Sequence, residues 1–161
     1  MKQVAAGYYN NNGNRNRWNG GGRNDNRGSG RELPAEIKPE QIPEDYVEQA
    51  EKVMRDVMGQ RGAITTSKIR NLLSMVSDIY NEENIRTETE LLPESVSALM
   101  MMRVRTVYEC GRDDTVKRFV QETRLLQYLK GIGSSRTELI RFAHYMEALV
   151  AYHLYFFGRE N

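Results

Sequence analysis

The residues best suited to catalysis or metal binding are two histidines and one cysteine. His144 and Glu147 are three residues apart, a spacing that can place two metal ligands on one face of a helix. No second such pair accompanies them. His153 falls among apolar residues on a helical wheel and is predicted to be a core histidine with one hydrogen-bond partner, and Cys110 to be a buried thiol. HExxH, P-loop, GxSxG and paired CxxC motifs are absent from the sequence. We therefore predict no metal, no cofactor and no enzymatic activity.

The basic side chains offer a different chemistry, the binding of a phosphate backbone. Lys68 and Arg70 lie in the first turn of a predicted helix, where backbone N–H groups and the helix dipole also attract an anion. Further candidates along the chain are Arg112, Lys117, Arg118, Arg124 and Arg141. Residues 103–141 hold nine basic and five acidic side chains, and such a strip could follow a phosphate backbone without reading bases. An ordinary solvated face is the alternative.

The last predicted helix carries apolar or aromatic residues on nearly every side. One stripe of these residues is expected to close the core. The other side carries Arg141 with Tyr145, Tyr152 and Tyr155, a mixture typical of contact surfaces because tyrosine adds both area and a hydrogen-bonding tip. We predict that these three tyrosines contact another subunit. A helix buried on all sides in the centre of the domain is the alternative.

Five helices are expected to position these residues, at about 45–59, 66–81, 93–111, 114–130 and 135–157. Apolar residues recur in each at helical spacing, and the boundaries carry capping residues. These include the N-cap cluster TTS at 65–67, Asp113 or Asp114, the Ser135–Glu138 capping box and Gly158. Short connections favour antiparallel neighbours, so the fold class is predicted to be all-α, a compact five-helix bundle over 44–161. Arg103 interrupts an apolar stripe and is expected to pair with a carboxylate inside the domain.

The first 43 residues differ in composition from the rest. Residues 1–31 are rich in Asn, Gly and Arg and carry a net charge of +5, against −4 for the remainder, and a Pro-containing linker follows. We predict a disordered tail, which either binds RNA weakly through its Arg, Tyr8, Tyr9 and Trp18 or is a solubilising extension. With no signal peptide and no apolar run long enough for a bilayer, we expect a cytoplasmic protein without membrane contact.

Three stretches of the sequence resemble a known family. They are ITTSKIRNLLSMVSDIY at 64–80, VRTVYECGRD at 104–113 and FAHYMEALVAYHLYFFGRE at 142–160. Together they resemble the small helical subunit of the type III-A CRISPR effector, the Csm complex, over roughly residues 44–160. The tail of residues 1–31 is not part of that pattern.

The resemblance implies a non-catalytic helical bundle that acts in antiviral defence. Several copies would stack head to tail along the subunits that carry the guide RNA, and would hold the backbone of the target RNA paired to that guide. Cleavage chemistry would belong to other subunits. By position, the resemblance implies RNA contacts for Lys68, Arg70 and Arg112, whereas the other basic candidates depend on the strip described above.

Two other functions remain open from the sequence. The segment around KGIGSS could be the turn of a helix-turn-helix in a DNA-binding regulator, although the helix after it is apolar and lacks Asn or Gln near its start. The chain could also be a homodimeric protein–protein module without a nucleic-acid role. The sequence sets neither the number of copies nor their order.

Overall fold

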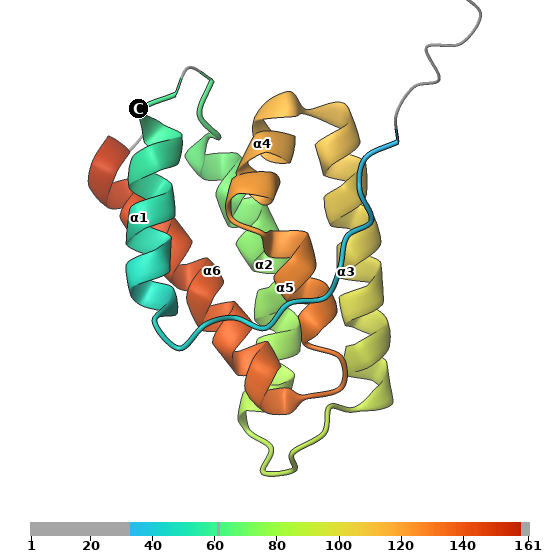
Figure 1. Cartoon of the computed structure of the whole chain (residues 1–161). Helices are drawn as coiled ribbons and strands as arrows, with labels where there is room; N and C mark the ends of the chain where they lie inside the picture. The colour runs from blue at the N-terminus through green and yellow to red at the C-terminus, as the bar shows by residue number, and fades with distance from the viewer. Residues whose placement is uncertain (1–32, 61, 159–161) are drawn as a thin grey trace, which may run out of the picture. The chain divides into compact units, whose positions relative to one another are not determined.

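The computed structural model describes residues 33–60 and 62–158, with the side chain of Met58 excepted. This part of the chain is all-helical and without β-strands, which confirms the predicted fold class (Figure 1). Its helices are α1 (Tyr46–Met58), α2 (Thr66–Asn84), α3 (Pro93–Arg112), α4 (Asp114–Glu122), α5 (Leu125–Gly131) and α6 (Arg136–Phe157). None of these helices is long and apolar enough to cross a membrane. The predicted disordered tail, residues 1–31, lies outside the described residues.

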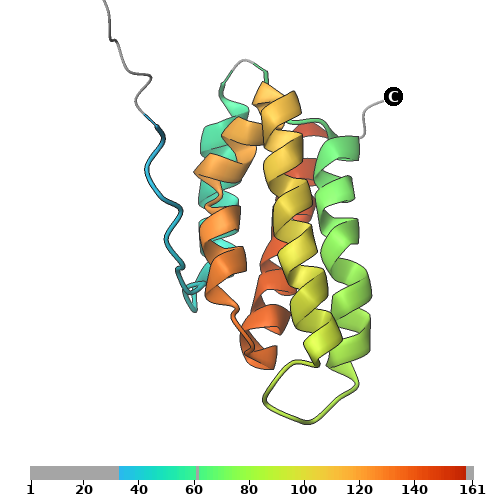
Figure 2. The same ribbon diagram turned by 90° about the vertical axis from the view of Figure 1, so that its right-hand side faces the viewer.

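Helix α6 is the centre of the bundle. It packs against α1 and α2, while α3 packs against α2, α4 and α5. Both views place α1 and α3 on opposite sides of the bundle, with α6 behind α3 in the second (Figures 1 and 2). The side chains of Phe119, Phe142 and Met146 are completely buried among these helices. The sequence of α6 is apolar on several sides because the helix has neighbours on several sides.

The helix starts follow the predicted capping chemistry. The side chains of Thr65, Asp113 and Ser135 accept hydrogen bonds from the first backbone N–H groups of α2, α4 and α6. Gly158 ends α6 with a positive φ of 69°. Local residue type decides these ends, which is why the sequence alone reveals them.

The predicted fourth helix, 114–130, is two helices in the structure. It breaks at Thr123 and Arg124, where Arg124 adopts a left-handed conformation with φ of 57°. The buried Thr123 hydroxyl donates to Phe119 O at 2.7 Å, and Thr123 O accepts from the Tyr145 hydroxyl at 3.0 Å. The first of these bonds is local and the second is tertiary. Together they stabilise the break, and no Gly or Pro marks it in the sequence.

The segment before α1 lies along α5. Glu40 N donates to Gln127 O at 3.0 Å, and Lys130 Nζ donates to Ile37 O at 2.7 Å. A Cβ atom on Gly131 would lie 1.8 Å from Glu40 O, so only glycine permits this approach. The predicted linker residues from Glu36 onward therefore belong to the compact helical unit.

One buried carboxylate connects the end of α2 to the start of α3. Glu83 is fully buried at the end of α2 and accepts hydrogen bonds from Leu92 N at 2.9 Å and Arg86 at 2.6 Å. Burial would raise the pKa of Glu83, but the hydroxyl of Ser95 and these two donors outweigh it and hold that pKa below 4.5. Glu83 thereby joins α2 to the loop that begins α3.

Candidate nucleic-acid interface

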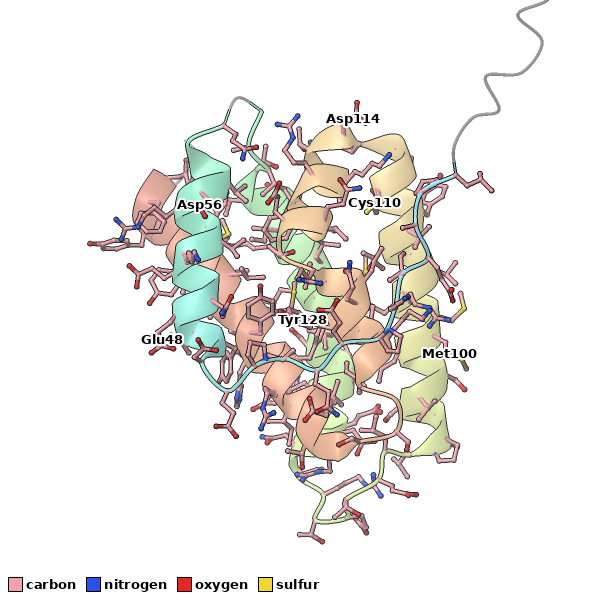
Figure 3. The ribbon with its side chains drawn as sticks, in the orientation of Figure 1. Glu48, Asp56, Met100, Cys110, Asp114 and Tyr128 are labelled. Atoms are coloured by element: carbon pink, nitrogen blue, oxygen red, sulfur yellow. The ribbon has the colours of Figure 1, made fainter. Side chains whose placement is uncertain are left out.

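A hollow of about 420 Å³ lies where α2 begins, α3 ends and α4 begins. Its lining comprises Lys68, Asn71, Leu72, Ser74, Met75, Glu109, Arg112 and Val116. Two of the predicted RNA-binding residues, Lys68 and Arg112, therefore share one site, although they are far apart in the sequence. Figure 3 shows this end of the bundle, where Cys110 and Asp114 are labelled.

Lys68 is held at the edge of the hollow by two groups from the start of α4. Its Nζ lies 2.5 Å from Asp113 Oδ2 and donates to Thr115 Oγ1 at 3.3 Å. Asp113 also accepts from Thr115 N and Val116 N as the N-cap of α4. The hydrogen bonds from Lys68 and Thr115 hold the pKa of Asp113 well below its ordinary value, so this carboxylate is charged at neutral pH.

Arg112 is more loosely held. Its guanidinium lies 3.4 Å from Glu109 Oε1 and 5.4 Å from the centre of the Tyr108 ring, and its side chain is 62% exposed. Exposed ion pairs contribute only about 0–1 kcal/mol, because water screens them and the side chains lose entropy. Arg112, and to a lesser degree Lys68, can therefore exchange a carboxylate for a phosphate at small cost.

Three further predicted residues lie on α2 and α4 but do not line the hollow. Arg70 is exposed on α2, and Lys117 and Arg118 are exposed on α4. Lys117 is close enough to Cys110 to lower the pKa of the thiol, although burial has the larger effect and raises it.

The remaining two basic candidates lie elsewhere. Arg124, at the α4–α5 break, pairs with Glu40 of the segment before α1. Arg141 pairs with Glu138 at 3.3 Å on the first half of α6. The structure therefore does not join all seven predicted cations into one strip, and these two have structural partners at their own positions.

Polar residues that the sequence reasoning missed complete the hollow. Asn71 and Ser74 line it beside the two cations. Asn71 is one helical turn after Lys68, so a search for polar residues at i+3 from each candidate cation would have found it. Glu109 was counted only as an opposing charge, and its pairing with Arg112 also follows from i, i+3 spacing.

The three predicted interface tyrosines have different environments. Tyr145 is 1% exposed, and its hydroxyl donates to Thr123 O inside the bundle. Our placement of Tyr145 on an accessible face is therefore wrong, because α5 and the break before it cover that side of α6. Burial raises the pKa of Tyr145 above its ordinary value. Tyr152 is half-buried and Tyr155 is 79% exposed, so both are available to a partner.

The candidates for catalysis or metal binding have structural partners. Buried His153 donates from Nε2 to Ile64 O at 2.8 Å, and its Nδ1 lies 3.4 Å from the Thr66 hydroxyl. The core position is as predicted, with two partners rather than one. His144 Nε2 lies 3.3 Å from the Tyr80 hydroxyl. Among the described residues, no group of three or more His, Cys, Asp or Glu is arranged to hold a metal ion.

Arg103 contradicts the prediction of an internal ion pair. It is half-buried, and no carboxylate pairs with it in the part of the chain that the structure describes. Instead Arg103 lines a groove of about 200 Å³ between α3 and α5, together with Val96, Leu99, Met100, Leu129, Lys130 and Gly133. The guanidinium is therefore available to a group from outside the molecule.

The fold and this site define a small all-α domain with a basic hollow at one end. A family model described as Csm2 Type III-A matches residues 40–159. The chain is 41% identical over 116 residues to "CRISPR system Cms protein Csm2" of Mycobacterium tuberculosis (strain ATCC 25618 / H37Rv), covering 71% of this chain and 93% of that protein. It is 37% identical over 121 residues to the protein of the same name from Streptococcus thermophilus, covering 73% and 95%. The chain belongs to the Csm2 family of type III-A CRISPR systems, which confirms the resemblance seen in the three sequence stretches.

Proposed function

We propose that this chain is a non-catalytic subunit of a type III-A effector complex in the cytoplasm. Several copies stack along the guide-bearing backbone subunits and hold the backbone of target RNA paired to the guide, in antiviral defence. Family membership supports the assembly, and the hollow that unites Lys68 with Arg112 supports the RNA contact. That union of two distant motif residues at one site is the observation that carries the proposal.

The chemistry of the hollow fits a phosphate backbone better than a base. Lys68 and Arg112 supply charge, while Asn71 and Ser74 supply hydrogen bonds to phosphate or ribose oxygens. Only three apolar side chains, Leu72, Met75 and Val116, line the hollow. None of its lining residues is aromatic, so a base has no ring there on which to stack. Sequence selection is left to base pairing with the guide.

The proposal is tested in the assembled complex by measuring target-RNA affinity as a function of salt. The double variant Lys68→Ala/Arg112→Ala is compared with Lys52→Ala/Lys38→Ala, which removes two exposed lysines outside the hollow. For each phosphate that a copy no longer neutralises, the slope of log affinity against log salt should fall by about 0.7 to 0.9. An unchanged affinity and slope for the double variant, in a complex of normal composition, would refute the RNA-binding role.

The DNA-binding alternative conflicts with the position of α6. A recognition helix must enter the major groove. Helix α6 packs against α1 and α2 and is buried at Leu139, Phe142, Met146 and Leu149 along its length. A duplex gel shift with defined and competitor sequences is expected to show no preferred site.

A further inference from the structure

Two exposed apolar surfaces lie on opposite sides of the helical bundle. The first, the α3 face, comprises Met100, Met101, Val104, Val107 and Tyr108, each between 48% and 61% exposed. These residues recur at helical spacing on the side of α3 away from the core residues Leu99, Met102 and Thr106. Figure 3 shows Met100 on the outer side of α3, far from Glu48 and Asp56 on α1. A stripe of this length on a soluble domain marks a contact surface.

The second surface, the α1–α6 face, comprises Tyr152, Tyr155 and Phe156 of α6, with Arg55 of α1 beside them. Phe156 stacks against Tyr152 with ring centres 6.1 Å apart, and its ring lies 5.3 Å from the Arg55 guanidinium carbon. The ring of Tyr155 contacts the ring of Phe156 edge-on, with the ring centres 5.3 Å apart. The ring contacts and Arg55 hold Tyr152 and Phe156, so ordering these two side chains on binding costs little further entropy.

The two surfaces carry opposite charge. Residues 100–112 of α3 include Arg103, Arg105 and Arg112 against one carboxylate, Glu109. Residues 44–56 include five carboxylates against Lys52 and Arg55. Glu51 and Glu48 are near enough to Tyr152 to contribute, after burial, to raising the pKa of its hydroxyl, which places them beside the aromatic cluster. An acidic rim therefore surrounds the α1–α6 face, and basic residues flank the α3 face.

We propose that the α3 face of one copy docks on the α1–α6 face of the next copy. This inference rests on the proposed stacking and assigns the two surfaces that meet. Because the faces differ and lie on opposite sides of the bundle, their contact is heterologous and each copy keeps one face free for another neighbour, which builds a row. A two-fold dimer through either face alone would instead oppose like charges.

The groove at Arg103 gives this contact an anchor point. It adjoins the α3 face through Met100, combines Leu99 and Leu129 with an Arg103 guanidinium that no described carboxylate engages, and has a volume of about 200 Å³. An aromatic ring with a polar tip suits such a site, because the ring packs on the aliphatic walls and the hydroxyl or π-face meets the guanidinium. Tyr155, the most exposed aromatic residue of the α1–α6 face, is the side chain that we assign to it.

Cysteine cross-linking in the assembled, guide-loaded complex tests the pairing of faces. In a Cys110→Ser background, Ser97→Cys marks the edge of the α3 face and Ala151→Cys marks α6 one turn before Tyr155; both native residues are exposed. Differently tagged copies with one site each are mixed and treated with a short bis-maleimide. We expect links between Ser97→Cys and Ala151→Cys copies, none within either population alone, and a ladder of products when one chain carries both sites.

Asn81→Cys, exposed on α2, replaces Ser97→Cys in the matched control and should give no links to Ala151→Cys. Links within one population, or no links in a complex that retains several copies, would overturn the assignment. RNA affinity is measured on the same samples. A ladder that persists in the Lys68→Ala/Arg112→Ala variant shows that the face assignment stands even when RNA binding fails. Missing links with normal RNA affinity would refute the faces alone.

Discussion

Lys68 Nζ lies 2.5 Å from Asp113 Oδ2, which joins the first turn of α2 to the N-cap of α4. The two residues belong to two of the sequence stretches that resemble the family, SKIRN and YECGRD. Their contact explains how separate motifs form one basic site. Asp113 positions Lys68, and under the proposed function it is also the group that a phosphate of the RNA would replace.

Substitutions at Asp113 should separate its two roles. Asp113→Ala removes both the cap of α4 and the ion pair with Lys68, and is expected to lower the free energy of unfolding by about 1–2 kcal/mol. Asp113→Ser keeps a capping oxygen and should cost only what the ion pair contributes, about 0–1 kcal/mol. Both changes release Lys68, so target-RNA affinity per copy should rise, by up to about fivefold if the ion pair contributes about 1 kcal/mol. Chemical denaturation and RNA titration check the two effects. Equal stability losses for Ala and Ser would contradict the capping role.

Gly131 is predicted to be required for docking the segment before α1. In Gly131→Ala the new methyl group would meet Glu40 O at 1.8 Å, so the segment must move, at a cost of roughly 1–3 kcal/mol. Hydrogen exchange should show faster exchange at the Glu40 amide, whose bond to Gln127 O is broken. The control is Gly111→Ala in α3, where a Cβ meets no atom within 4 Å and should stabilise the helix by up to about 1 kcal/mol. Unchanged protection at Glu40 would contradict the docking.

Glu83 should make the protein sensitive to acid. Because the folded-state pKa is depressed, its contribution is complete above the ordinary pKa of 4.5 and is lost as the pH falls through the folded-state value. At neutral pH, Glu83→Gln is expected to lower the free energy of unfolding by about 1–3 kcal/mol. That difference from the unaltered protein should shrink as the pH is lowered below 4.5. Denaturation across this pH range measures it.

Glu88→Gln provides the matched control for Glu83. Glu88 lies 3.4 Å from the same Arg86 but is 63% exposed, so its removal should change stability by no more than about 0.5 kcal/mol. Equal effects for the two substitutions would show that burial of Glu83 is not what makes it important.

Tyr155 should be a dominant residue of the contact between copies. Truncation to Ala is expected to weaken association by about 2 kcal/mol or more, since anchoring aromatic residues contribute most at interfaces. Tyr155→Phe should retain most of the affinity, because the ring remains. Ile85→Ala is the control. This residue, in the loop after α2, is 84% exposed but belongs to neither face. The count of copies per complex from native mass spectrometry should fall only for Tyr155→Ala.

Local chemistry made most of the fold predictable. The caps at Thr65, Asp113 and Ser135 and the end at Gly158 depend on residue types next to the helix, and the apolar spacing defines the helical faces. The break at Arg124 was missed because it is stabilised by buried bonds of Thr123, one of them from distant Tyr145. The helical spacing of apolar residues does not indicate such long-range contacts.

The site was predictable only in part, for the same reason. Motifs identified Lys68 and Arg112, but their common hollow depends on how α2, α3 and α4 pack. For Tyr145 and Arg103, the predicted environments were wrong. A helical wheel assigns sides, yet α5 and the break before it cover the side that holds Tyr145, and no described carboxylate reaches Arg103. Neighbouring helices, rather than the wheel, decide which polar side chain is accessible.

The most direct test of the RNA-binding claim is to map which peptides of this chain cross-link to target RNA. The guide-loaded complex is irradiated with bound target, and the attached peptides are identified by mass spectrometry. We predict attachment within residues 66–75 and 108–118, which border the hollow at the ends of α2, α3 and α4. Cross-links confined to α1 and the end of α6, or none from this subunit while target is bound, would contradict the account.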